Sequence, residues 1–186
     1  AGVQTDAGPV ACDKAVIAAG IHSKSLAAQA GDRVPLQSER GYHVVIPANE
    51  IQAHMPLMPG DGKMGNNPTL AGLRIAGQVE LASVSAAPNW ARTDILLKHA
   101  RTTYPALTDR SSTSGIDRWM GHRPSTADGL PVIGFASASR DIIHAFGHGH
   151  VGLATGPASG QLVADLIADR GPAFDISALS AGRFRA

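Results

Sequence analysis

The chain of 186 residues contains little cysteine, few aromatic residues and no excess of one charge. Its single cysteine, Cys12, excludes an internal disulfide and any zinc or iron–sulfur site built from several cysteines. The 16 basic and 15 acidic residues give a net charge of +1 without a basic cluster, which argues against nucleic acid as the main partner. Aromatic residues make up only 4%, so no stacking platform for a single nucleic-acid strand is expected.

Long apolar runs are also missing. No run approaches the roughly 18 residues that a membrane-spanning helix requires, so no transmembrane segment is expected. The first residues have no basic stretch followed by a long apolar one, and a signal peptide is therefore not expected either. Apolar residues nevertheless make up 44% of the chain and charged residues 17%, which predicts a folded core rather than disorder.

The most informative stretch joins a short apolar strand to the start of a helix. Residues 142–146 predict a buried strand, and the apolar spacing after residue 160 predicts a helix. Between them Gly147, Gly149 and Gly152 spell G-x-G-x-x-G. Such a joint lets the backbone approach a ligand, and it directs unpaired N–H groups and the positive helix end at an anionic or electron-rich group. A tight turn that binds nothing is the alternative on spacing alone.

A dinucleotide-binding fold is a poor explanation of these glycines. That fold needs a second parallel strand after the helix and an acidic residue about 20 residues further on. Here the helix is expected to end near residues 170–172, and the tail that follows has no apolar alternation. The nearest acidic residues, Asp165 and Asp169, lie inside the expected helix. The context therefore argues against an NAD(P)-dependent dehydrogenase.

The N-terminal part predicts a fragment of a parallel sheet. Residues 14–20 form a short apolar strand that ends in a glycine, and a helix is expected over 23–30. A strand of this kind belongs inside a parallel sheet, yet the only other clear candidate for that sheet is the strand around Ile142. We therefore expect part of the sheet to be missing from the chain.

The middle of the chain predicts an antiparallel sheet with one helix laid on it. A strand is expected over 41–47, a long loop over 48–70, and a helix that Asn89 caps and Pro105 ends. Residues 73–82 alternate between apolar and polar side chains, with a bulge expected at Gly77. The two expected faces are Leu73, Ile75, Val79 and Leu81 on one side, and Arg74, Gln78 and Glu80 on the other.

Arg123 is a candidate for binding a carboxylate. The proline that follows it favours an extended backbone, and a guanidinium held on an extended segment suits bidentate capture of a carboxylate. An ordinary surface arginine in a salt bridge remains the alternative from the residues alone.

Several stretches together resemble one family. They are Trp119-Met-Gly-His-Arg-Pro-Ser-Thr-Ala-Asp-Gly-Leu-Pro-Val-Ile-Gly134, Ala145-Phe-Gly-His-Gly-His-Val-Gly-Leu-Ala-Thr-Gly-Pro157, Val16-Ile-Ala-Ala-Gly20, Glu39-Arg-Gly-Tyr-His43, Gly72-Leu-Arg-Ile-Ala-Gly-Gln-Val-Glu80 and Arg183-Phe184. In their order along the chain they resemble the C-terminal half of the FAD-dependent D-amino-acid oxidase/dehydrogenase superfamily, and within it the D-amino-acid dehydrogenases. The resemblance covers nearly the whole chain.

The resemblance implies a fold class of α/β plus α+β, the C-terminal part of a FAD-binding flavoprotein with an antiparallel-sheet substrate domain. The N-terminal nucleotide-binding βαβ unit of the family has no counterpart in this sequence. Residues 1–33 would end the flavin-binding domain, 34–118 would form the substrate domain, and 119–186 would return to the flavin-binding domain with its flavin-facing loop and C-terminal helix. Because the phosphate cradle is missing, this chain alone is expected to hold FAD poorly and to be inactive.

The resemblance also assigns roles to residues. Arg123 would pair with the substrate carboxylate, and His150 and Tyr42 would face the substrate, although a core tyrosine is an equal alternative for Tyr42. His148 is expected to brace the loop through a hydrogen bond, and Arg74 and Glu80 to form an internal ion pair. The residues expected to contact FAD are Ala19, Gly20, Gly147, His148, Gly149, His150, Val151, Gly152, Leu153, Ala154 and Thr155. No metal site is expected.

The activity implied is oxidation of the CH–NH2 group of a D-amino acid or a related small amino acid to an imino acid and then a 2-oxo acid. The expected partners are FAD, the small amino-acid substrate and the missing N-terminal flavin-domain segment, and a homodimer is a further expectation. A cytoplasmic location, or a peripheral one at the inner face of the membrane, would follow. The alternative is a flavin-free binding or scaffold subunit that pairs with a separate flavin-domain chain through the edge of its incomplete sheet.

Overall fold

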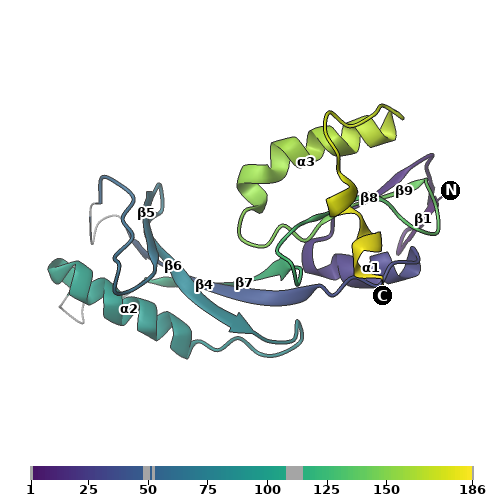
Figure 1. Ribbon diagram of the computed structural model, residues 1–186. Helices are drawn as coiled ribbons and strands as arrows, with labels where there is room; N and C mark the ends of the chain where they lie inside the picture. Colours follow the sequence, from purple (N-terminus) through teal and green to yellow (C-terminus); the bar gives the residue numbers. More distant parts are fainter. Residues whose placement is uncertain (1, 48–50, 52, 108–114, 186) are drawn as a thin grey trace. The chain divides into compact units, whose positions relative to one another are not determined.

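The computed structural model describes residues 2–47, 51, 53–107 and 115–185. The chain divides into two compact units (Figure 1). Unit 1 comprises Ala1–Ser38 and Arg123–Ala186, and unit 2 comprises Glu39–His122. The boundaries between the two units therefore lie a few residues after the expected boundaries at 33/34 and 118/119.

Unit 1 is built on a three-stranded sheet with the order β3-β9-β8. β3 (Ala15–Ile17) runs parallel to β9 (Ile142–Phe146), and β8 (Val132–Phe135) runs antiparallel to it. The expected pairing of the N-terminal strand with the strand around Ile142 is thus confirmed. Along its other edge β3 has no neighbouring strand among the residues that the structure describes. A separate hairpin, β1 (Gly2–Thr5) with β2 (Gly8–Ala11), precedes this sheet.

Helices cover both faces of the unit 1 sheet. The long helix α3 (Gly152–Ile167) packs Leu162 and Leu166 on Ile133 and Ile143. On the opposite face a second apolar cluster contains side chains from α1 (Ser23–Gln29), from β8 and β9 and from the C-terminal turn η5 (Ala181–Phe184). The short turns η1 (Gly20–His22) and η4 (Ser177–Leu179) complete the unit.

A buried carboxylate ties distant parts of unit 1 together. Asp32, which follows α1 and is 1% exposed, accepts hydrogen bonds from the backbone N–H of Ser137 at 2.8 Å and from its hydroxyl. Further bonds come from His144 Nε2 at 2.9 Å and from Arg185 Nη2 at 3.2 Å. Burial alone raises the pKa of Asp32, but the hydrogen bonds from Ser137 and His144 outweigh this effect and hold the pKa below its ordinary value.

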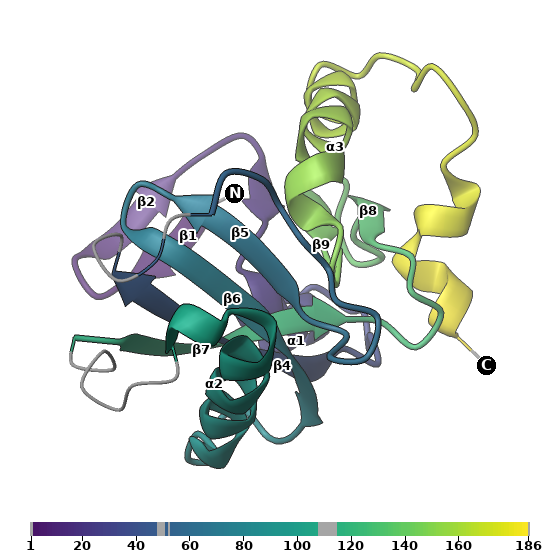
Figure 2. The ribbon, with the colours of Figure 1, turned by 90° about the vertical axis from the view of Figure 1, so that its left-hand side faces the viewer.

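Unit 2 is a four-stranded sheet with one helix on it (Figure 2). Its strand order is β5-β6-β4-β7, and β6 (Gly72–Leu81) pairs antiparallel with both β4 (Gln37–Pro47) and β5 (Gly65–Thr69). β7 is Asp117–Ser125, and the helix α2 is Ala91–Thr103, followed by the turn η2 (Pro105–Leu107). The antiparallel sheet with one helix is the arrangement that the sequence predicted.

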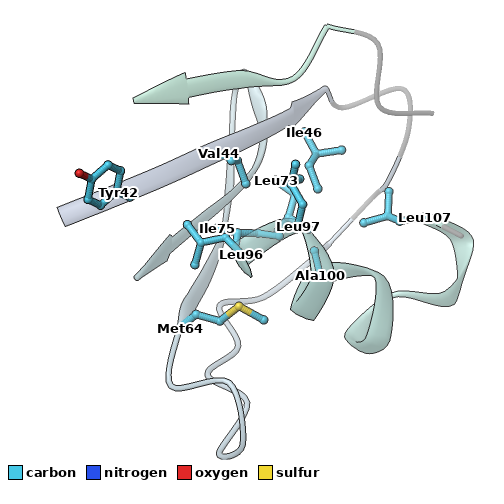
Figure 3. Packing of buried hydrophobic residues seen from close by; sticks show 10 residues of the cluster. All are labelled: Tyr42, Val44, Ile46, Met64, Leu73, Ile75, Leu96, Leu97, Ala100 and Leu107. Atoms are coloured by element: carbon cyan, nitrogen blue, oxygen red, sulfur yellow. The ribbon is translucent and has the colours of Figure 1, made fainter. Parts of the chain in front are cut away.

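The core of unit 2 is a single apolar cluster between sheet and helix. Ten buried residues form it, and Figure 3 shows them gathered between the strands and α2. They are Tyr42, Val44, Ile46, Met64, Leu73, Ile75, Leu96, Leu97, Ala100 and Leu107. Removing a large buried side chain from such a cluster costs about 2–5 kcal/mol of unfolding free energy.

Two predictions about unit 2 are wrong in detail. The expected loop over 48–70 contains the strand β5, which lies at the edge of the sheet, where Pro68 costs no hydrogen bond to a neighbouring strand. Asn89 does not cap α2, since the N-cap position is Trp90. The backbone N–H of Asn89 instead donates to the hydroxyl of Tyr42 at 3.0 Å.

The bulge predicted near Gly77 is confirmed, and it reverses the faces of β6. Gln78 has a positive φ of 61° and lies between Gly77, which pairs with Tyr42, and Val79, which pairs with Gly41. The extra residue shifts the alternation by one position. After the bulge Val79 and Leu81 are therefore exposed, whereas Glu80 turns inward. The expected assignment of these residues to faces is right before Gly77 and wrong after it.

Candidate active site

The loop between β9 and α3 requires glycine at two positions. Gly147 has φ 86° and Gly149 has φ 54°, both in the left-handed region where other residues are strained. A Cβ on Gly147 would also lie 3.0 Å from Cγ2 of Thr126. The first turn of α3 then begins at Gly152, with no acidic side chain in it. Its backbone N–H groups have no partner within the helix, so they can face an electron-rich group.

His148 braces this loop against the helix. Its Nε2 lies 2.8 Å from Oγ of the buried Ser159, about two turns into α3. Burial lowers the pKa of His148, so the neutral imidazole is favoured at this position. A Cβ on Gly152 would approach Cβ of His148 to 3.1 Å. The hydrogen bond expected from the sequence is thus present, and it holds the loop at a fixed distance from the helix.

The end of β7 lies directly beside the glycine loop. The backbone N–H of Gly149 donates to the carbonyl of Pro124 at 3.0 Å, and Ser125 forms a β-bridge with His148. Arg123 immediately precedes the proline that accepts this bond, and its side chain is half-buried. The structure therefore brings the backbone of the Arg123 segment and the loop together within unit 1.

A second arginine fixes the turn that follows. Arg183 makes a bidentate pair with Asp128, with Nε–Oδ2 at 2.7 Å and Nη2–Oδ1 at 3.2 Å, and also donates to the carbonyl of Leu130 at 2.7 Å. The hydrogen bond from Arg183 is the main reason why the pKa of Asp128 falls to about 2. Arg183 of the C-terminal motif therefore holds the turn between β7 and β8. Sequence reasoning missed Asp128, for which the turn-forming Asp128-Gly129 pair was the available signal.

The carboxyl ends of the parallel strands β3 and β9 lie at one edge of the unit 1 sheet. β3 leads into Ala19 and Gly20, and β9 leads into Gly147. Since β3 and β9 are parallel, with Ile17 opposite His144, these ends lie at the same edge, which is where open α/β sheets bind ligands. Gly20 has φ 57°, which a residue with a side chain would adopt only with strain.

A hollow of about 300 Å³ adjoins this edge, between β3, β9 and α3. Its size is at the lower end of ligand pockets. The residues that line it are Val16, Ala18, Ala145, His148, Gly156, Ser159, Gly160 and Val163. Most of them are small, so a flat or extended group can lie close to the backbone of α3. Of the other expected FAD contacts, His150, Val151, Leu153 and Ala154 are exposed, and Thr155 is half-buried.

The structure does not place Tyr42 with these residues. Tyr42 belongs to the core of unit 2 and is 1% exposed. Its hydroxyl donates to Glu80 and accepts from Asn89, which is the core-tyrosine alternative. The next residue, His43, points to the opposite face of β4, because successive side chains of a strand alternate.

The expected ion pair between Arg74 and Glu80 is wrong. Glu80 pairs with Arg40 at 3.5 Å and with Arg92 at 3.7 Å, whereas Nη2 of Arg74 lies 3.3 Å from Nδ1 of His43. The cause is the bulge at Gln78, which sends Glu80 to the face opposite Arg74. The hydrogen bond from Tyr42 is the main cause that lowers the pKa of Glu80.

Neither a metal cluster nor a membrane helix accompanies the site. Within residues 2–47, 51, 53–107 and 115–185, no three His, Cys, Asp or Glu side chains are grouped so that they could hold a metal ion. In the same part of the chain, no helix combines the length and the apolar character needed to cross a bilayer.

The residues present fit the isoalloxazine part of FAD better than its phosphates. The loop offers positive-φ glycines and the free N–H groups of a helix end, which suit an electron-rich ring at close range. A second glycine-rich turn for a pyrophosphate does not follow any other strand of unit 1 that the structure describes.

Comparison with known proteins supports this interpretation. The family model of FAD dependent oxidoreductases, named DAO, matches residues 1–166. A D-amino-acid oxidase of Bradyrhizobium diazoefficiens is 50% identical over 182 residues, which cover 98% of this chain and 43% of that protein. A D-amino acid dehydrogenase of Paramagnetospirillum magneticum is 33% identical over 187 residues, covering 99% of this chain and 43% of that protein.

A solved structure agrees with the sequence relatives. The crystal structure of glycine oxidase from Geobacillus kaustophilus superimposes with a TM-score of 0.85 at 25% identity, covering 100% of this chain and 49% of that one. The chain thus spans less than half the length of these relatives. Since the family model matches most of its residues, the chain belongs to the DAO family of FAD-dependent oxidoreductases.

Proposed function

We propose that this chain is the C-terminal part of an enzyme that oxidises the CH–NH2 group of a D-amino acid or a related small amino acid. The observation that carries the proposal is the hydrogen bond from Gly149 N–H to the Pro124 carbonyl. It joins the segment of Arg123, a carboxylate-binding candidate, to the loop that fits a flavin ring. Relatives named D-amino-acid oxidase and D-amino acid dehydrogenase support the substrate class.

Each residue then has a defined task. Arg123 binds the substrate carboxylate through two parallel N–H donors and so orients the Cα–H bond. The loop from Gly147 to Thr155, together with Ala19 and Gly20, holds the flavin ring, and His148 keeps this loop in place through Ser159. FAD, when bound, accepts the two electrons of the Cα–H bond as a hydride.

The proton balance needs no strong base in this chain. A substrate whose amine is neutral becomes an iminium when the hydride leaves Cα, and water then hydrolyses the iminium to a 2-oxo acid and an ammonium ion. His150 is exposed on the loop and is the residue of this chain that we assign to the substrate side. We do not assign Tyr42 a catalytic role, because its hydroxyl bonds to Glu80 and Asn89.

An upstream segment is the partner that the site requires. We infer that it supplies the phosphate cradle of FAD and a strand beside the open edge of β3. The alternative is a flavin-free subunit that uses the same edge to bind a separate chain, and the open edge favours it equally. The two differ in the role of Arg123, because in a scaffold beside a separate flavin-domain chain Arg123→Ala would leave amino-acid oxidation by the complex unchanged.

The first test compares two arginines in the enzyme that comprises this chain and its upstream segment. Arg123→Ala should raise the KM for the amino acid by one to three orders of magnitude, because the loss of a buried, charge-paired contact costs about 2–5 kcal/mol. Flavin content should not change. Arg140→Ala removes an exposed arginine that lies 4.1 Å over the ring of Phe135, and it is the matched control. An unchanged KM in Arg123→Ala would contradict the assignment.

A further inference from the structure

A groove of about 300 Å³ lies between α2 and β7 within unit 2. Asp94, Leu97 and Arg101 form its helix wall, because residues three, four and seven positions apart lie on one side of a helix. Ile116 and Arg118 form its strand wall, because alternate residues where β7 begins point to one face of the sheet. We call this feature the α2–β7 groove.

The floor of the α2–β7 groove is apolar. Leu97 is 7% exposed and belongs to the core cluster of unit 2, and Ile116 packs against the same cluster. A polar ligand group placed on these two side chains would lose its hydrogen bonds to water without gaining new ones. An aliphatic group would instead be removed from water, which is favourable.

The rim of the groove carries a guanidinium that is already held in place. Nη2 of Arg118 lies 2.9 Å from Oδ1 of Asp94, and the two side chains are 41% and 63% exposed. This bond occupies one nitrogen of the guanidinium, which has further N–H groups to donate. Because Asp94 fixes Arg118 against the helix, Arg118 loses little conformational freedom when it binds an anion.

Arg101 supplies a second positive charge. It follows Asp94 by seven residues, which is a rise of about 10 Å along α2, and its side chain is half-buried. Within the part of the chain that the structure describes, the guanidinium of Arg101 forms no hydrogen bond or ion pair. Two long arginine side chains can span this distance with a small anion between them, so the charge of Arg101 is available to a ligand.

The charges of the groove favour a monoanion. Two guanidinium groups and one carboxylate leave one net positive charge, which a single carboxylate neutralises. A phosphate monoester carries nearly two negative charges at neutral pH and would leave an excess negative charge beside Asp94. A planar carboxylate also matches the parallel N–H donors of a guanidinium.

We propose that the α2–β7 groove binds a small monocarboxylate that has an aliphatic part. The carboxylate lies between Arg101 and Arg118, and the aliphatic part lies on Leu97 and Ile116. The groove shares no residue with the flavin loop or with the carboxylate-binding candidate of unit 1. Its ligand is therefore bound in addition to the amino acid that is oxidised, and its test does not depend on the oxidation.

The test measures binding of 3-methylbutanoate to the flavin-containing enzyme by isothermal titration calorimetry. Every protein carries Arg123→Ala, so that the carboxylate-binding candidate of unit 1 does not contribute. Binding should be saturable, and Arg101→Gln should weaken it by about tenfold or more, as expected for the loss of a charge-assisted hydrogen bond. Arg101→Lys should weaken it less, because it keeps the charge and loses only the planar fork.

The matched control is Lys98→Gln, which removes an exposed cation of the same helix outside the groove. It should leave the affinity unchanged. Absence of saturable binding, or equal losses in Arg101→Gln and Lys98→Gln, would overturn the proposal. Arg101 also lies in the last turn of α2, where a positive charge stabilises the helix, so the readout is affinity rather than melting temperature.

A second measurement changes the charge of the groove. Asp94→Asn removes the carboxylate of Asp94 and leaves two net positive charges. Isobutyl phosphate, which is mostly a dianion above its second pKa, should then gain affinity relative to 3-methylbutanoate. If Asp94 served only to brace Arg118, both probes would lose affinity equally, and that result would contradict the assignment of the groove to a monoanion.

Discussion

Among the residues that the structure describes, unit 1 buries the charged side chain of Asp32 and unit 2 that of Arg40, and the two differ in the reach of their hydrogen bonds. In unit 2 Arg40 is 0% exposed and donates to the carbonyls of Ser83, Ala86 and Ala87. These partners lie 43 to 47 residues away in the chain. In unit 1 Asp32 binds Ser137, His144 and Arg185, which lie 105 to 153 residues away.

The difference shows how the two units are held together. Unit 2 is one continuous segment with one apolar cluster, and Arg40 fixes the connection between β6 and α2 within it. Unit 1 is assembled from both ends of the chain around two smaller clusters, and Asp32 joins these ends. Because contacts between distant residues cost more loop entropy, unit 1 should form later in folding than unit 2.

The largest expected loss of stability comes from removing the charge of Arg40, whose partners lie nearby in the chain. Arg40→Met leaves the carbonyls of Ser83, Ala86 and Ala87 without this donor and removes one of the two arginines paired with Glu80. It should lower the free energy of unfolding by about 3–5 kcal/mol. Urea denaturation followed by circular dichroism measures this loss. Arg92→Met is the control, since Arg92 also pairs with Glu80 but its side chain is 27% exposed. Equal losses in the two variants would mean that burial of Arg40 is unimportant.

A smaller loss of stability is expected from removing the charge of Asp32, whose partners are distant in the chain. Asp32→Asn keeps the size of the side chain but weakens the bonds from His144 and Arg185, and it should cost about 1–3 kcal/mol. Asp165→Asn, which breaks a pair with the exposed Arg170, should cost less than 1 kcal/mol and serves as the control. If the two variants unfold at the same urea concentration, Asp32 does not join the ends of unit 1.

The pH dependence of stability should also report the hydrogen bonds of Asp32. The pKa of Asp32 is lower in the folded state than in the unfolded one, so its contribution is complete above the ordinary aspartate pKa. That contribution disappears as the pH falls through the lowered folded value. In thermal melts between neutral and strongly acidic pH, Asp32→Asn should therefore flatten part of the acid limb. Identical acid limbs for Asp32→Asn and the parent would refute this.

The smallest effect should come from the exposed member of the Asp32 network. The side chain of Arg185 is 59% exposed, and exposed ion pairs contribute only about 0–1 kcal/mol. Arg185→Ala should therefore shift the melting temperature by a few degrees at most. A loss of stability as large as that of Asp32→Asn would show that Arg185, rather than the bonds from Ser137 and His144, holds unit 1 together.

Local patterns in the sequence were sufficient to predict the strand, loop and helix that carry the candidate site. The strand over 142–146, the positive-φ glycines and the helix after Gly152 all follow from short-range signals, and the structure contains each of them. The antiparallel sheet of unit 2 was predicted for the same reason. The position of Arg123 beside the loop depended on family resemblance, because no local pattern specifies which strand lies next to a turn.

The remaining features depend on contacts or registers that a single sequence does not encode locally. The run Tyr42-His43-Val44-Val45-Ile46 has no polar alternation, so the inward position of Tyr42 could not be decided from it. The Asp32 network joins residues too distant for any sequence window. The stacking of the His43 and Trp119 rings likewise required the pairing of β4 with β7, which only the fold provides.

Because of the bulge at Gln78, one extra residue with a positive φ decides on which face of the sheet each later residue of β6 lies. Without that extra residue, Leu81 would enter the interior and Glu80 would leave Arg40 for the side that holds His43. A carboxylate beside the imidazole would favour its protonated form and turn an uncharged surface into an ionic one. Relatives that lack one residue here should thus carry a different charge on the face of the sheet opposite α2, even if the core on its other face is the same.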